Sequence, residues 1–210
     1  MVTEIAIYLE GGGPTSATMT PFRQGMSGFL KPIVELVRKR RIKWKIIPCG
    51  GRSEAYKYFC DALTNEPEVF NVLLVDSETL PVAALPWDHL SQREGDLWKK
   101  PVGVTDDNCH LMAACMEAWI ITDRDALKKH FKKGFDESKL PMPQYAEATE
   151  KAVIADSLDK ATKNTTAGAY KKIHDGAKLL LLIDPAVVRQ HCKWCDRLFV
   201  ILASKIGENI

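Results

Sequence analysis

The chain has 210 residues, of which 46% are hydrophobic and 27% are charged, a balance typical of a globular protein and not of a disordered or fibrous one. Lysine and arginine together number 29 against 27 aspartate and glutamate residues; the net charge of +2 excludes a generally basic nucleic-acid-wrapping protein but leaves room for a local basic patch. No stretch approaches the roughly 18 uncharged apolar residues of a membrane span, and the first residues do not resemble a signal peptide. We therefore expect a cytoplasmic protein whose six cysteines are reduced and mostly buried.

Three apolar runs alternate with two amphipathic segments in the first part of the chain. Residues 4–9, 42–47 and 70–75 are short apolar runs that predict buried strands. Residues 20–41 have apolar side chains at helical spacing, with a kink or restart at Pro32, and a second helix is expected to begin at a Ser53 cap. This βαβαβ order predicts a parallel sheet, because each crossover is long enough to return the chain to the same edge.

The rest of the chain predicts one more strand and then helices. Residues 79–108 lack periodicity and form a long insertion, either a lid or a packing excursion. A fourth strand is expected at 109–115 and a helix at 116–131. Further helices are expected at 147–161, 167–183, 185–192 and 195–206. We expect an α/β domain over residues 1–135, with a mainly parallel sheet flanked by helices, and a helical C-terminal segment over 136–210 packed on it.

Acidic residues follow two of the predicted strands. Glu10 comes after the first strand, and Asp76 and Glu78 end the third. Ligands of open α/β sheets bind at the carboxyl ends of the strands, and crowded carboxylates repel each other unless a cation such as Mg²⁺ neutralises them. Three glycines next to Glu10 would let backbone N–H groups approach a phosphate closely: Gly11, Gly12 and Gly13. These features predict a metal-dependent phosphate site; the alternative is that Asp76 only forms a cap or turn.

The two acidic motifs resemble those of a known fold family. Leu9-Glu10-Gly11 and Asp76-Ser77-Glu78 are similar to the signature of the TOPRIM family, which includes topoisomerases, primases and overcoming-lysogenization-defect-type nucleases. The resemblance covers about the first 125 residues. It implies a Rossmann-like sheet, Glu10 as general acid/base or metal ligand, and Asp76 and Glu78 as Mg²⁺ or Mn²⁺ ligands. Two features depart from the family pattern: Asp-x-Glu replaces Asp-x-Asp, and three glycines follow Glu10 where one is usual.

A closer resemblance is to small TOPRIM-like bacterial proteins that are encoded beside ATPases of the AAA or SMC type and are suspected of antiviral defence. It rests on segments 9–13, 49–52, 75–78, 116–119 and 163–170. This resemblance implies nucleic acid, in the first place DNA, and a neighbouring ATPase as partners. No membrane partner is expected, and the chain could form a homo-oligomer.

Two more residues are candidates for the site. Glu117 is an acid inside an apolar stretch, and the resemblance to TOPRIM nucleases implies a second-metal ligand there, with Asp123 as a weaker candidate. The alternative is that Glu117 pairs with a lysine or arginine in the core, or caps a helix. Arg52, after the second strand, could bind a phosphate through its planar guanidinium group, or could be an ordinary surface arginine.

Basic residues occur in clusters whose function the sequence leaves open. They could follow a nucleic-acid backbone, or they could be solvated helix ends, where cations are favoured by the helix dipole. The clusters are Arg38, Lys39, Arg40 and Arg41 with Lys43 and Lys45; Lys128, Lys129, His130, Lys132 and Lys133; and Lys171, Lys172 and His174. The pair Cys192 and Cys195 lacks the other two ligands of a structural zinc site and is expected to face the core.

Two functions agree with this sequence. The first is a Mg²⁺-dependent TOPRIM-type nuclease that hydrolyses phosphodiester bonds as the effector of an ATPase-linked defence or DNA-processing system. The second is a non-catalytic TOPRIM-like scaffold or regulatory partner of an ATPase. ATPase and dehydrogenase activities of the chain itself are disfavoured, because the Gly-Lys-Ser/Thr ending of a Walker A loop and the G-x-G-x-x-G fingerprint are both missing.

Overall fold

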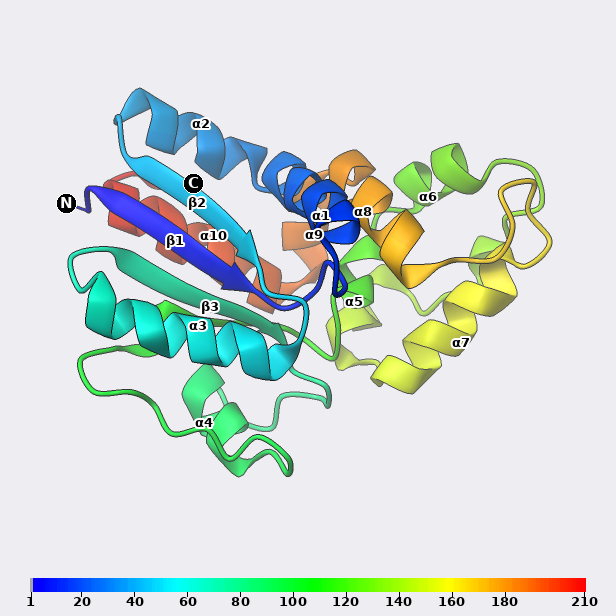
Figure 1. Ribbon diagram of the computed structural model, residues 1–210. Helices are drawn as coiled ribbons and strands as arrows, with labels where there is room; N and C mark the ends of the chain where they lie inside the picture. The colour runs from blue at the N-terminus through cyan, green and yellow to red at the C-terminus, as the bar shows by residue number, and fades with distance from the viewer. Residues whose placement is uncertain (1) are drawn as a thin grey trace.

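Four parallel strands form the sheet in the computed structural model, which describes residues 2–210 (Figure 1). The strands are β1 (Glu4–Leu9), β2 (Lys43–Pro48), β3 (Phe70–Asp76) and β4 (Cys109–Met112), in the spatial order β2-β1-β3-β4. The central strands β1 and β3 are buried along almost their whole length, which explains their unbroken apolar runs. The predicted α/β class with a parallel sheet is confirmed, and the architecture is consistent with a Rossmann-like fold.

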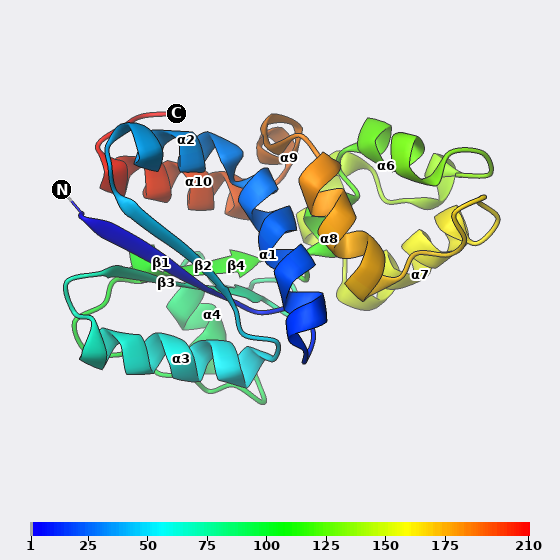
Figure 2. The same ribbon diagram turned by 45° about the horizontal axis from the view of Figure 1, so that its top comes forward.

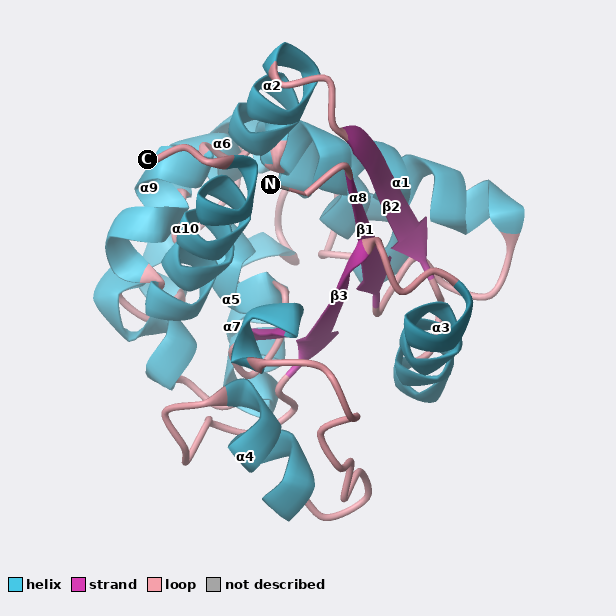
Figure 3. Cartoon of the chain, turned by 90° about the vertical axis from the view of Figure 1, so that its left-hand side faces the viewer, coloured by secondary structure: helices cyan, strands magenta, loops and turns pink. Residues whose placement is uncertain are grey.

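Alternate residues of the central strands face two layers of helices (Figures 2 and 3). Ile5 and Ile7 pack with α1 (Ser16–Phe29), α2 (Lys31–Lys39) and α10 (Lys193–Ile206) on one face. Ala6 and Tyr8 pack with α3 (Arg52–Asn65) and α4 (Pro86–Gln92) on the other. Because successive residues of a strand point to opposite faces of the sheet and helices cover both faces, the side chains on both faces are apolar.

The remaining helices gather beyond the carboxyl ends of the strands (Figure 1). They are α5 (Glu117–Ile120), α6 (Arg124–Phe131), α7 (Lys151–Thr162), α8 (Lys172–Leu182) and α9 (Pro185–His191), with the short 3₁₀ helices η2 (Glu137–Lys139) and η3 (Pro143–Ala148). A further 3₁₀ helix, η1 (Asp106–Asn108), directly precedes β4 at the opposite edge of the sheet. The C-terminal part is helical, as expected, and the boundary at residues 135/136 stays a prediction. Within residues 2–210, no helix combines the length and apolarity that crossing a membrane requires.

The helix predicted over residues 20–41 is two helices. The first begins earlier, at Ser16, and ends at Phe29; Pro32 stands at the start of the second, where its missing N–H costs no hydrogen bond. Gly25 and Gly28, which weaken the sequence pattern, have a packing function. A Cβ atom on Gly25 would overlap the carbonyl oxygen of Ala177, so the glycine allows α8 to lie directly against α1.

Three local expectations were wrong in detail. Residues 116–131 form α5 and α6 because the Asp123 side chain accepts the Ala126 N–H and starts a new helix. Helix α3 is preceded by Gly51, and Ser53 lies inside its first turn. The fourth strand ends at Met112.

The long insertion is packed against the domain: Trp87 is 2% exposed, and the ring of Trp98 stacks on that of Tyr56 with centroids 4.3 Å apart.

Candidate metal and phosphate site

Three carboxylates from two neighbouring strands meet at the carboxyl edge of the sheet. Glu10 follows β1, Asp76 ends β3, and Glu78 lies two residues further on. One carboxylate oxygen of each residue lies within 4.8 Å of the others. The convergence that parallel pairing of β1 and β3 predicts is therefore present. Because hard cations prefer carboxylate oxygens, this cluster could hold a metal ion.

Hydrogen bonds fix the two innermost carboxylates. Glu10 Oε2 accepts the backbone N–H of Asp76 at 3.1 Å and a guanidinium N–H of Arg52 at 3.2 Å. Asp76 Oδ1 accepts the backbone N–H of Met116 at 2.9 Å, and Asp76 is only 3% exposed. Burial, followed by the charge of Asp76, raises the pKa of Glu10 to about 7. Burial also raises the pKa of Asp76 above its ordinary value.

Two lysines approach the same carboxylates from the C-terminal helices. Lys151 Nζ lies 2.6 Å from Glu78 Oε1 and 3.1 Å from Asp76 Oδ2. Lys172 Nζ lies 3.7 Å from Asp76 Oδ2 and 3.4 Å from Glu117 Oε2. These lysines are the first residues of α7 and α8, where the helix dipole disfavours cations. The acidic cluster therefore accounts for their positions.

Sequence reasoning included Lys172 only as a phosphate contact and missed Lys151. The sequence carried no usable signal for their position, because the helices predicted at 147–161 and 167–183 begin four and five residues before Lys151 and Lys172, and only the structure shows that these lysines start α7 and α8.

Arg52 is neither an ordinary surface arginine nor a free phosphate clamp. Its guanidinium group donates to both carboxylate oxygens of Asp96, at 2.8 and 2.6 Å, and also to Glu10 and to the carbonyl oxygen of Asp76. It lies 4.8 Å from the centroid of the Trp98 ring. Arg52 thus ties the long insertion, through Asp96 and Trp98, to the acidic cluster. Asp96 was not identified from the sequence.

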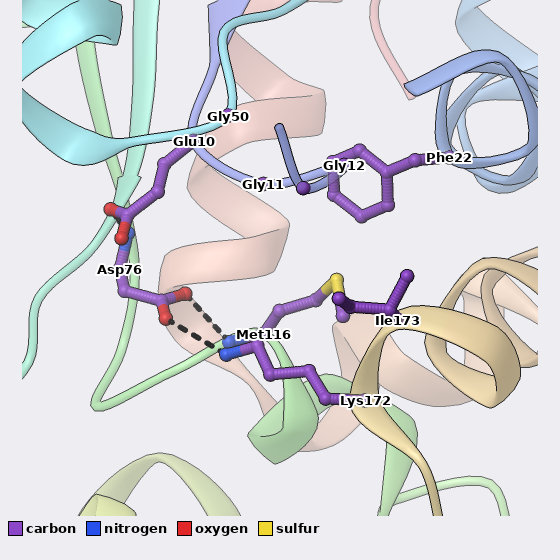
Figure 4. Close-up of a pocket in the computed structure, with 10 residues that line it drawn as sticks. Glu10, Gly11, Gly12, Phe22, Gly50, Asp76, Met116, Lys172 and Ile173 are labelled. Atoms are coloured by element: carbon purple, nitrogen blue, oxygen red, sulfur yellow. Dashed lines mark hydrogen bonds and ion pairs between the residues drawn. The ribbon is translucent and has the colours of Figure 1, made fainter. Parts of the chain in front are cut away.

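A cavity of about 370 Å³ opens beside the carboxylates (Figure 4). Glu10, Asp76 and Lys172 form its polar wall, whereas Phe22, Met116 and Ile173 form an apolar wall on the other side. The glycine loop and Gly50 complete the lining. The cavity therefore joins a charged region to an apolar one, as ligand sites commonly do.

The glycine loop meets the phosphate-binding expectation only in part. The N–H of Gly11 donates to the carbonyl oxygen of Gly50 and is not available to a ligand. Among residues 2–210, no backbone acceptor is found for the N–H groups of Gly12 and Gly13, which have φ angles of 89° and 69°. A Cβ on Gly11 would lie 2.6 Å from Phe22 Cζ, so a glycine is needed there for the ring to approach.

Glu117 and Asp123 lie outside the three-carboxylate cluster. Glu117 accepts a hydrogen bond from the Tyr170 hydroxyl at 3.1 Å and pairs with Lys172, which separates it from Asp76. This arrangement matches the ion-pair alternative, and a second-metal role of Glu117 stays a prediction. Asp123 uses Oδ1 to cap α6 and Oδ2 to accept the Asp184 N–H, so its role is structural. Cys192 and Cys195 are fully buried.

The raised pKa of Glu10 predicts that the metal-free protein loses stability as the pH rises. A carboxyl group with a pKa of about 7 in the folded state and 4.5 ordinarily binds its proton more tightly when folded. Its stabilising contribution is complete below pH 4.5 and is lost as the pH passes through 7. The loss amounts to roughly 3 kcal/mol, and the raised pKa of Asp76 acts in the same direction.

Denaturant unfolding in EDTA, from about pH 5 to about pH 8, measures this effect. Glu10→Gln should make the free energy of unfolding depend less on pH over this interval. An equally steep dependence in that variant would contradict the assignment to Glu10.

Comparison with known proteins gives one match. The family model described as Domain of unknown function (DUF4276) matches residues 23–203. The matched range contains Asp76, Glu78, Lys151 and Lys172, and it begins after Glu10 and the glycine loop. No curated protein and no solved structure matches the chain.

Proposed function

The chain belongs to the DUF4276 family, and we propose that it is a Mg²⁺- or Mn²⁺-dependent phosphodiesterase of TOPRIM type that cleaves nucleic acid, in the first place DNA. One observation carries this proposal: Glu10, Asp76 and Glu78 converge within 4.8 Å beside a cavity that is also lined by a lysine and by two glycines whose N–H groups have no backbone acceptor within residues 2–210. Carboxylates for a cation and N–H groups for a phosphate are two components that metal-dependent phosphodiester hydrolysis uses.

The residues have separable roles in this proposal. Glu10, Asp76 and Glu78 would hold the cation, which supplies neutralisation of the negative charge that develops on the phosphate. Within the described chain, the hydrogen bonds to Glu10 fall on Oε2, which leaves Oε1 for the cation or for taking or giving a proton. Lys172 and the Gly12 and Gly13 N–H groups would orient the phosphate in the cavity.

The ion pairs support a second candidate function, a non-catalytic scaffold or regulatory partner of an ATPase. Each of the three carboxylates already has a cationic partner: Arg52 for Glu10, and Lys151 for both Asp76 and Glu78. Such pairs can exist for packing alone. The two functions differ in one requirement. Only the nuclease requires a divalent cation to bind the three carboxylates, either beside the lysine and arginine side chains or in their place.

Activity of the purified chain tests the proposal. We expect hydrolysis of bis(p-nitrophenyl) phosphate and of plasmid DNA in Mn²⁺ or Mg²⁺, and none in EDTA. Because the small diester needs only the cation and the cavity, it reports on the site alone. No hydrolysis of either substrate, in either metal, would favour the scaffold.

The place of the protein in a cell is part of the proposal. As the effector of an ATPase-linked defence or DNA-processing system, it would act in the cytoplasm and bind an AAA- or SMC-type ATPase. Co-expression with an ATPase from a neighbouring gene, followed by affinity purification, should recover both chains. Recovery of this chain alone would argue against the partnership.

A further inference from the structure

We propose that five lysines at the end of the molecule formed by the loops after α6 and α7 bind the phosphate backbone of a nucleic-acid strand, an inference that rests on the proposed function and extends it to the substrate. The lysines lie on segments 128–135 and 163–172, neither of which contains an acidic residue. We call them the lysine surface: Lys129, Lys132, Lys133, Lys163 and Lys171.

The two segments lie side by side in the structure (Figures 1 and 2). The backbone N–H of Thr166 donates to the carbonyl oxygen of Lys133 at 3.2 Å. Gly134 approaches the other segment so closely that a Cβ there would overlap the carbonyl oxygen of Asn164. Lysines that are about 30 residues apart in sequence are therefore held on one end of the molecule.

Asp175 connects this end of the molecule to the start of α8. Its Oδ2 accepts the backbone N–H of Lys171 at 2.7 Å, and its Oδ1 lies 3.2 Å from Nε2 of His130, in the last turn of α6. The loop before α8 is also bound at Tyr170, whose N–H donates to the Thr162 hydroxyl at 2.8 Å. These bonds fix the backbone from which the lysines extend, so little of it must be ordered when a ligand binds.

The five lysines lack acidic partners, although partners are common for their neighbours. All five are exposed, and none lies within ion-pair distance of an acidic side chain in residues 2–210. In contrast, Lys128 pairs with Glu137 and Lys160 pairs with Asp156. In a chain with a net charge of only +2, this is a local concentration of unneutralised positive charge, which a polyanion can neutralise.

Helix dipoles explain only part of the lysine surface. Lys132 and Lys163 follow the last residues of α6 and α7, where cations are favoured. Lys171, however, precedes α8, where the dipole disfavours a cation. It is adjacent in sequence to Lys172, which lines the cavity beside Asp76. Lys171 is therefore the member of the lysine surface that links it along the chain to the candidate site.

A triple substitution tests the lysine surface without touching the cavity. The test variant carries Lys132→Ser, Lys133→Ser and Lys163→Ser. The control variant removes the same charge at three exposed lysines outside the lysine surface, which have no ion pair within residues 2–210: Lys39→Ser, Lys57→Ser and Lys99→Ser. Fluorescence anisotropy of a labelled oligothymidylate in EDTA, between about 50 and 200 mM salt, gives the affinity and its salt dependence. Three lost phosphate contacts should weaken binding and reduce the slope of log K against log salt by about 2, at about 0.7 per contact.

The inference would be overturned if the unmodified chain did not bind the oligonucleotide, or if the triple variant kept the affinity and the salt slope of the unmodified chain. An equal loss of affinity in the control variant would also overturn it, as would tighter binding to phosphatidylserine vesicles than to the oligonucleotide. Hydrolysis of bis(p-nitrophenyl) phosphate should be the same in all three proteins, because that substrate is too small to reach the lysine surface. If no protein hydrolysed that substrate but the unmodified chain still bound the oligonucleotide, the proposed reaction would be contradicted, whereas the binding function of the lysine surface would not.

Discussion

Asp76→Asn should lower metal-dependent hydrolysis of a small phosphodiester by roughly 1,000-fold or more. Asp76 is the most buried of the three clustered carboxylates, and one of its oxygens lies within 4.8 Å of an oxygen of each of the other two. Removing its charge removes a cation ligand, and the several kcal/mol of charge stabilisation that a bound cation supplies correspond to at least three powers of ten. Asparagine keeps an oxygen that can accept the Met116 N–H, so the loop that follows β4 should remain in place.

The matched control is Asp125→Asn, an equal change of charge on a side chain that is 96% exposed and that, among residues 2–210, has an ion pair only with Lys128, at 3.9 Å. Rates of both variants are measured in saturating Mn²⁺, and circular dichroism checks that both are folded. Wild-type activity in Asp76→Asn would contradict the assignment of this carboxylate to the reaction.

Lys151→Gln should destabilise the metal-free protein by roughly 2–3 kcal/mol. The substitution leaves Asp76 and Glu78 without the ammonium group that lies between them at 3.1 and 2.6 Å. Breaking a fully buried pair costs about 3–5 kcal/mol, and the 34% exposure of the Lys151 side chain reduces that value. In Mn²⁺ most of the loss should be recovered, because the cation supplies the missing positive charge.

Lys160→Gln is the control on the same helix. Lys160 pairs with Asp156 at 2.6 Å, but both side chains are more than half exposed, so the expected loss is about 0.5 kcal/mol or less. Denaturant unfolding of both variants in EDTA and in Mn²⁺ gives the four free energies. If Mn²⁺ restored nothing to Lys151→Gln, the ion pairs would be structural and the scaffold function would be favoured.

The sheet and its acidic ends were predictable from local sequence. The runs that became β1 and β3 are apolar on both faces, as buried parallel strands are, and Glu10 and Asp76 stand where those runs end. Once parallel pairing was inferred, the meeting of their carboxylates followed from topology alone.

The partners of those carboxylates were not predictable, because they come from distant parts of the chain. Lys151 is 75 residues from Asp76, and Asp96 is 44 residues from Arg52. Each is an ordinary charged residue in its local context, and only tertiary packing gives it a specific partner. The early start of α1 was missed for a different reason: Pro21 suggested a helix start, whereas Thr15 is the residue that precedes the first turn.

Direct titration of the purified chain with Mn²⁺ and with Mg²⁺ in a calorimeter tests the central claim, that Glu10, Asp76 and Glu78 form a divalent-cation site. We expect saturable binding by the unmodified protein, and its loss in Glu10→Gln and in Glu78→Gln, two variants that each remove one carboxylate of the cluster. Absence of binding by the unmodified protein would contradict the account. So would binding by both variants that is as tight as that of the unmodified protein.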